Sequence, residues 1–119
     1  MRSEKLYLVD IADAIYIIGR AVEGITEGEW LADPIRRDGV MYRPIIIGEA
    51  ASRVSTEFRT RHSYVNWRSI IGFRNFSVHE YFSVDWDIVW DAITYDLPVL
   101  AQQIAQILRD EFGEEPPAY

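Results

Sequence analysis

The sequence predicts an all-α protein, an antiparallel bundle of four or five helices. Two observations indicate this class. Apolar residues recur at intervals of three and four over most of the chain, and no segment alternates apolar and polar residues over enough positions to predict a strand. The length of 119 residues fits a single domain. We place this domain at residues 1–112 and expect residues 113–119, which begin with a glycine, to form a flexible tail.

The first helix is predicted over residues 3–22. Its polar residues Asp10, Asp13 and Arg20 fall on one narrow stripe, and nearly every other position after the first turn is apolar. A helix that is apolar around most of its circumference is buried on more than one side. In a domain of this size, the simplest extra neighbour is a partner subunit.

Two more helical segments are expected in the next part of the chain. Thr26 and Glu29 have the spacing of a capping box, so a short helical turn follows them. A longer helix is predicted over residues 34–59. Gly39 and Pro44 weaken its first half, and we expect a kink or a break there.

The second half of the chain predicts two further helices. Residues 60–65 are expected to form a loop, after which Asn66 can cap a helix over residues 67–81. Asp85 can cap the last helix, whose apolar residues are spaced alternately four and three apart, as in a bundle seam. Pro98 should bend this helix, because the carbonyl four residues earlier loses its hydrogen-bond donor.

The charge distribution is uneven. The net charge of −7 argues against non-specific binding to nucleic acid. Residues 36–74 are the exception, because they contain eight arginines and three acidic residues. Arginine suits phosphate or carboxylate recognition. This segment could therefore meet a polyanion, or it could pair with the acidic helices beside it, and composition leaves both alternatives open.

Several classes of site and location are excluded or disfavoured. The chain has no cysteine, which excludes disulfides, cysteine-ligated metals and thiol catalysis. Its two histidines are His62, expected to be a solvated loop residue, and His79; we predict neither a metal nor a cofactor. No signal peptide and no run of roughly 18 uncharged apolar residues is visible. We therefore expect a cytoplasmic protein with no membrane association.

The fourth predicted helix contains two residues that packing does not explain. Trp67, Ile71 and Val78 define its apolar line, but the positions that continue this line between them are Arg74 and Asn75. Polar groups on a core-facing line are costly unless they are paired. They must either face a carboxylate or line a cleft.

Structural roles remain open for these residues and their neighbours. Arg74 could form an ion pair with Asp87 or Asp91 of the last helix. His79 could interact with the negative end of its helix dipole, and Tyr81 could pack at the helix end with its hydroxyl in water. The residue types by themselves favour these roles.

The order Arg74-Asn75, three residues, His79, one residue and Tyr81 resembles the active-site signature of the HEPN superfamily, in particular of HepT-like ribonuclease toxins. The resemblance extends over most of the chain on both sides of this motif. The flanking similarities lie in residues 47–51, in residues 66–72 and at several positions from 82 to 98.

The resemblance implies an endoribonuclease toxin that cleaves RNA without a metal, as a homodimer whose two motifs face each other across an RNA cleft. It also implies a minimal nucleotidyltransferase antitoxin, which silences the toxin by transferring AMP to the motif tyrosine. Carried over to this chain, Arg74 holds the scissile phosphate and His79 is the acid/base. Asn75 positions them, and Tyr81 accepts AMP.

These residue types suit attack of a ribose 2′-hydroxyl on its own phosphate. A histidine can move the proton near neutral pH, and an arginine can stabilise the developing charge. In an acidic chain, RNA binding also requires arginines beside the cleft, and we expect these to be Arg53, Arg59, Arg61 and Arg68. The alternative function is a non-catalytic helical module that docks a nucleotidyltransferase partner.

Overall fold

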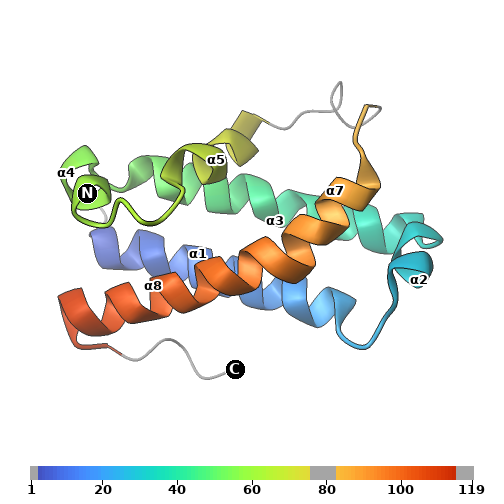
Figure 1. Ribbon diagram of the computed structural model, residues 1–119, viewed down its shortest axis with the longest axis horizontal. Coiled ribbons are helices and arrows are strands. Elements are labelled where there is room, and N and C mark those ends of the chain that lie inside the picture. Colours follow the sequence, from blue (N-terminus) through green and yellow to red (C-terminus); the bar gives the residue numbers. More distant parts are fainter. Residues whose placement is uncertain (1–2, 76–82, 115–119) are drawn as a thin grey trace.

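The computed structural model describes residues 3–75 and 83–114, and within these ranges the chain forms helices and connecting turns with no strand (Figure 1). The predicted all-α class is therefore confirmed. His79 and Tyr81 lie outside the described residues. None of the helices in the described ranges is long and apolar enough to cross a membrane.

Long helices form the body of the molecule and short ones connect them. The long elements are α1 (Glu4–Val22), α3 (Pro34–Arg53) and a rod made of α7 (Trp86–Asp91), η2 (Ala92–Asp96) and α8 (Leu97–Phe112). The short elements are α2 (Glu27–Leu31), α4 (Thr56–Arg61), α5 (Trp67–Gly72) and η1 (Phe73–Asn75).

Helix α1 packs against both α3 and α8, and both of these run in the direction opposite to α1 (Figure 1). Its buried residues are Leu8, Ile11, Ala14, Ile15 and Ile18. Two neighbours within the chain therefore account for its wide apolar circumference, and no partner subunit is needed to explain it. Leu6 and Ile17 remain 41% and 40% exposed.

The predicted helix starts are confirmed by their capping hydrogen bonds. Thr26 Oγ1 accepts from the backbone N–H of Glu29, and Glu29 Oε1 accepts from the N–H of Thr26, both at 3.1 Å. Asn66 and Asp85 accept from N–H groups in the first turns of α5 and α7. These side chains satisfy donors that have no partner within the helix.

The prediction of one helix extending to Arg59 is wrong at its C-terminal end. Helix α3 ends at Arg53, and Ser55 caps a separate helix, α4. The backbone N–H of Ser55 donates to Glu4 Oε1 at 2.6 Å, so a contact with α1 fixes the new helix start. Pro44 lies inside α3, which continues through it, so of the expected kink or break the break does not occur.

The loop predicted at residues 60–65 is shorter than expected, because α4 continues to Arg61. In the last rod, where a bend is expected at Pro98, the helix changes type just before that residue. Residues Ala92–Asp96 form a π-helical turn, in which the N–H of Leu97 donates to the carbonyl of Ala92. Pro98 then lies in the first turn of α8, where its missing N–H costs little.

Trp30 fixes the short helix α2 to the rod. Its side chain is completely buried, and its ring lies 5.7 Å from that of Trp86 and 5.5 Å from that of Trp90. Aromatic pairs at these separations add to the stabilisation from apolar burial. This contact holds α7 at the end of the molecule opposite to α4 (Figure 1).

Candidate active site

Arg74 and Asn75 lie in η1, a 3₁₀ turn that directly follows α5, and both residues are exposed. They therefore do not continue the core-facing line, and of the two alternatives expected for them, a carboxylate partner or a cleft, Asn75 lines a hollow. The helix tightens at Phe73, and a 3₁₀ turn advances each residue by about 120° instead of about 100°. Phe73 takes the inward position and packs against the core, so the motif residues turn outward.

The structural role considered for Arg74 was an ion pair with Asp87 or Asp91. Among the described residues, Arg74 forms no ion pair with either carboxylate. An exposed guanidinium retains a planar set of donors that matches a phosphate group. The internal role expected for Arg74, an ion pair with Asp87 or Asp91, is thus not found among the described residues.

The backbone of η1 lies directly on α3 at Gly48. A Cβ atom at position 48 would lie 2.5 Å from the backbone nitrogen of Arg74 and 2.9 Å from the carbonyl oxygen of Ile70. Only glycine permits such a close approach. Gly48 is thus a positioning residue for the motif. The sequence indicated it only as one of residues 47–51, which resemble the family on the N-terminal side of the motif.

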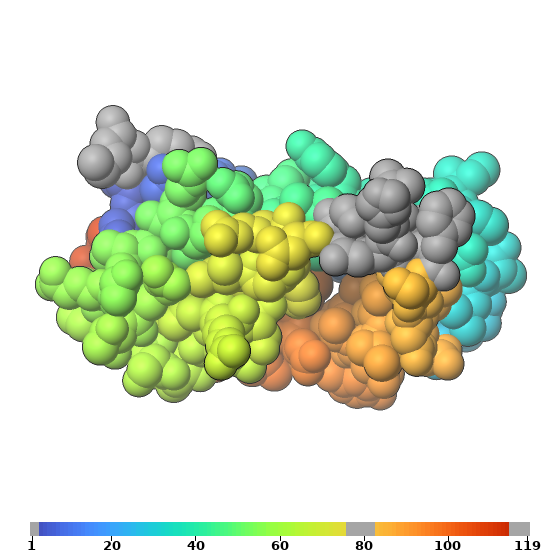
Figure 2. Space-filling view, turned by 90° about the horizontal axis from the view of Figure 1, so that it is seen from above, coloured from blue at the N-terminus to red at the C-terminus, as the bar shows by residue number. Residues whose placement is uncertain are grey.

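A hollow of about 540 Å³ lies beside the motif. Asn75 is among its lining residues, together with Gly72 at the end of α5 and side chains from α3 and the rod. Figure 2 shows it between the olive surface of α5 and η1 and the orange surface of α7. Its described lining includes Met41, Pro44, Phe73, Asn75, Asp85 and Ile88. Asn75 therefore lies on a concave surface, and Arg74 is its neighbour in the same turn.

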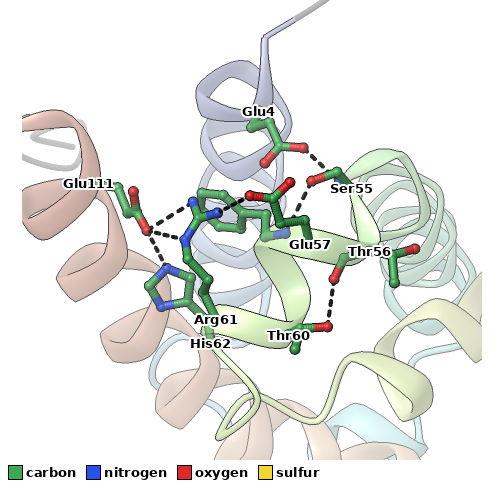
Figure 3. Close-up of polar contacts among 9 residues, drawn as sticks. Glu4, Ser55, Thr56, Glu57, Thr60, Arg61, His62 and Glu111 are labelled. Atoms are coloured by element: carbon green, nitrogen blue, oxygen red, sulfur yellow. Dashed lines mark hydrogen bonds and ion pairs between the residues drawn. The ribbon is translucent and has the colours of Figure 1, made fainter.

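His62 is held by two hydrogen bonds, so its prediction as a solvated loop residue is wrong. Its Nε2 lies 2.8 Å from Glu111 Oε1, and its Nδ1 lies 3.2 Å from the hydroxyl of Tyr64. Arg61 also contacts Glu111, at 3.2 Å, and Glu57, at 3.4 Å (Figure 3). The His62 side chain is only 12% exposed. This cluster joins α4 to the end of α8.

The cluster predicts an acid-sensitive contribution to stability. The hydrogen bond from His62, with that from Arg61, holds the pKa of Glu111 below its ordinary value of 4.5. Because the folded-state pKa is the lower one, the ionised carboxylate stabilises the fold above the ordinary value. This stabilisation is lost as the pH falls toward the folded-state pKa. We expect Glu111→Gln to lower the Tm at pH 7 and to flatten its decline on acidification, as measured by thermal unfolding.

Glu57→Gln is the matched control for this variant. Glu57 contacts the same arginine, but its side chain is 86% exposed, so its removal should change the Tm little. If the Tm of Glu111→Gln declines on acidification as steeply as that of the wild type, the cluster adds no pH-dependent stability.

The four arginines predicted to bind RNA divide into two pairs. Arg53 and Arg61 form ion pairs with carboxylates of α3, α4 and α8. Arg59 and Arg68 form none with any described residue, and both line one hollow on the surface of α4 and α5. Of the two alternatives left open by the composition, pairing within the chain is therefore found for Arg53 and Arg61.

No group of three or more His, Asp or Glu side chains in residues 3–75 and 83–114 is placed to hold a metal ion. The described side chains at and beside the motif are instead an arginine, an amide, the Ser83 hydroxyl, the Asp85 carboxylate and apolar groups. Arg74 and Asn75 can bind a phosphate there, whereas Asp85 accepts hydrogen bonds from the first turn of α7.

The all-α fold and the exposed turn at Arg74 and Asn75 fit the class of helical nucleases that the motif resembles. The family model described as "Ribonuclease HepT-like" matches residues 11–107. The chain belongs to the HepT-like ribonuclease family, which confirms the resemblance stated from the motif.

Similar proteins have ribonuclease names. The chain is 34% identical over 111 residues to "Putative RNase TTE0752" of Caldanaerobacter subterraneus, covering 93% of this chain and 99% of that protein. It is 34% identical over 99 residues to "Probable ribonuclease HepT" of Thermococcus cleftensis, covering 83% and 90%. No solved structure gives a significant match to the chain.

Proposed function

We propose that the protein is an endoribonuclease that needs no metal ion and acts as the toxin of a toxin–antitoxin pair. Family membership supports ribonuclease activity on RNA. The observation that carries the proposal is the exposed Arg74 guanidinium on a turn packed against Gly48, beside a hollow. The packed turn presents this exposed cation at one place on the surface, where it can stabilise a negative charge that develops on a phosphate.

The reaction is a transesterification at one phosphodiester. Arg74 binds the non-bridging oxygens of the scissile phosphate. His79 takes the proton from the 2′-hydroxyl, whose oxygen attacks phosphorus, and a protonated histidine gives a proton to the departing 5′-oxygen. Asn75 orients these groups. The products are a 2′,3′-cyclic phosphate and a 5′-hydroxyl, and every proton transfer uses a side chain that titrates near neutral pH.

The active form is a homodimer that joins two motifs at one cleft. Apolar side chains on the rod support this proposal, because Ile88, Tyr95 and Val99 are 66%, 69% and 55% exposed. Ile88 also lines the hollow beside Asn75, so a dimer formed through this side of the rod brings the two motifs together.

Light scattering at micromolar concentration should give twice the monomer mass. A strict monomer with full activity would contradict the shared cleft.

The partner is a minimal nucleotidyltransferase antitoxin, and Tyr81 is its AMP acceptor. An adenylyl group would add a negative phosphate and bulk two residues from His79, and RNA would be excluded by repulsion and occlusion. Intact mass after incubation with ATP and the transferase checks this step. Tyr81→Phe should gain no mass and should remain active.

The first test is RNA cleavage in excess EDTA by protein that intact mass shows to be unmodified. We expect cleavage, with cyclic phosphates at the product ends. If the unmodified protein leaves RNA intact, with or without added divalent cations, the enzyme proposal fails. The better interpretation is then a non-catalytic module that docks a nucleotidyltransferase.

A further inference from the structure

The surface of α4 and α5 contains a second hollow, of about 690 Å³, away from the one beside Asn75. Both helices and the loop between them lie on the face shown in Figure 2. Its lining combines cations, hydroxyl groups and aromatic rings. The residues that matter for binding are Arg59, Arg68, Thr60, Ser63, Tyr64 and Trp67.

The two arginines of this pocket differ from neighbouring arginines in their ion pairing, although Asp110 and Glu111 lie near enough to act on Tyr64 in its wall. Neither Arg59 nor Arg68 forms an ion pair within residues 3–75 and 83–114, in contrast to Arg53 and Arg61. Arg59 Nη2 donates to Thr56 Oγ1 at 3.4 Å, and its buried Nε has no hydrogen-bond acceptor among the described groups. Two guanidinium groups and nearby hydroxyls form a site suited to one phosphate.

The aromatic ring of Tyr64 lies in the same pocket, and residues that do not line the pocket hold its hydroxyl in place. Tyr64 is 58% exposed, but its hydroxyl is hydrogen-bonded to His62, which is itself bonded to Glu111. A held and exposed ring can stack on an unpaired base, and such stacking does not depend on base identity. The cluster around His62 thus also orients one wall of the pocket.

We propose that this pocket binds one unpaired nucleotide of the RNA substrate, next to the position of cleavage. Arg59 and Arg68 hold its phosphate, and its base stacks on Tyr64. Arg68 precedes Arg74 by six residues, roughly 9 Å along the helix axis, so one short single strand can reach both sites. This inference rests on the proposed ribonuclease function, and it adds a preference for single-stranded RNA longer than a dinucleotide.

The test uses Arg59→Gln, Arg68→Gln and Tyr64→Leu, with Arg20→Gln as the control. Arg20 lies on α1 and pairs with Glu23 at 3.2 Å. Its replacement also removes one positive charge, but at a residue that does not line the pocket. For a single-stranded oligonucleotide, each pocket variant should raise KM about tenfold with kcat unchanged. Cleavage of a dinucleotide should stay at the wild-type rate, because a dinucleotide does not extend into the pocket.

A binding measurement separates this proposal from the enzyme proposal. Fluorescence anisotropy with a 2′-O-methyl oligoribonucleotide, which cannot be cleaved by this route, needs no catalysis. Each arginine variant should reduce the slope of log affinity against log salt by about 0.7, as for one lost phosphate contact. If the pocket variants bind this oligonucleotide as tightly as Arg20→Gln does, the pocket proposal is overturned, even if the wild type cleaves RNA. Retained RNA affinity with lost affinity for the nucleotidyltransferase would also overturn it.

Discussion

Replacement of Arg74 by alanine is expected to slow RNA cleavage about 10²–10³-fold and to leave the fold intact. The loss follows from removal of one oriented donor to the charge that develops on the phosphate. The fold should survive because the side chain is exposed and forms no ion pair with a described residue. Arg74→Lys should recover part of the rate, since it keeps the charge but loses the planar donor set. Single-turnover cleavage in EDTA measures both variants, and thermal unfolding checks the fold.

His79→Ala belongs to the same prediction. Loss of a general acid or base costs about 10²–10⁴-fold in rate, and it should also remove the pH dependence that a histidine gives near neutrality. The two losses should not multiply in the double variant, because both groups act on one transition state. A variant of either residue that cleaves RNA at the wild-type rate would show that the motif is not the catalytic site.

Gly48→Ala is expected to lower stability by about 1–3 kcal/mol and to reduce cleavage as well. The new methyl group would lie 2.5 Å from the nitrogen of Arg74 and 3.1 Å from the carbonyl carbon of Phe73. Since the crowded atoms belong to the backbone, no side-chain rotation can relieve the clash. The turn that holds Arg74 must move away from α3. Thermal unfolding measures the first effect, and cleavage by the folded fraction measures the second.

Gly39→Ala is the matched control, since it lies in the same helix with nothing within 4 Å of the new Cβ. It should stabilise the protein by about 0.4–1 kcal/mol, because alanine loses less backbone freedom on folding. If Gly48→Ala unfolds at the same temperature as Gly39→Ala and cleaves RNA normally, the turn does not depend on this close approach.

The helix starts were predictable because their signals are local. A capping side chain and its target N–H lie within three residues of each other, as at Thr26, Asn66 and Asp85. The end of α3 was not predictable in this way. It depends on a hydrogen bond from Ser55 to Glu4, a residue 51 positions earlier, and no local pattern reports such a contact.

The same distinction applies to the site. The order of Arg74, Asn75 and the residues after them can be read directly from the sequence, but the direction of their side chains cannot. The change from α-helix to 3₁₀ turn at Phe73 turned a predicted core line outward. Likewise, Arg61 and Arg68 look equivalent in sequence. They differ because Glu111, 50 residues after Arg61, reaches only the first of them.

The packing of α1 against α8 sets an order of events during synthesis. The first helix leaves the ribosome long before the last one, and its apolar circumference is covered only when both α3 and α8 are present. At about 5–20 residues per second, the interval between the two helices is roughly 5–18 seconds. During this interval the nascent chain exposes a surface that the completed ribonuclease conceals. A protein that recognises this surface would meet the chain only before its fold is complete.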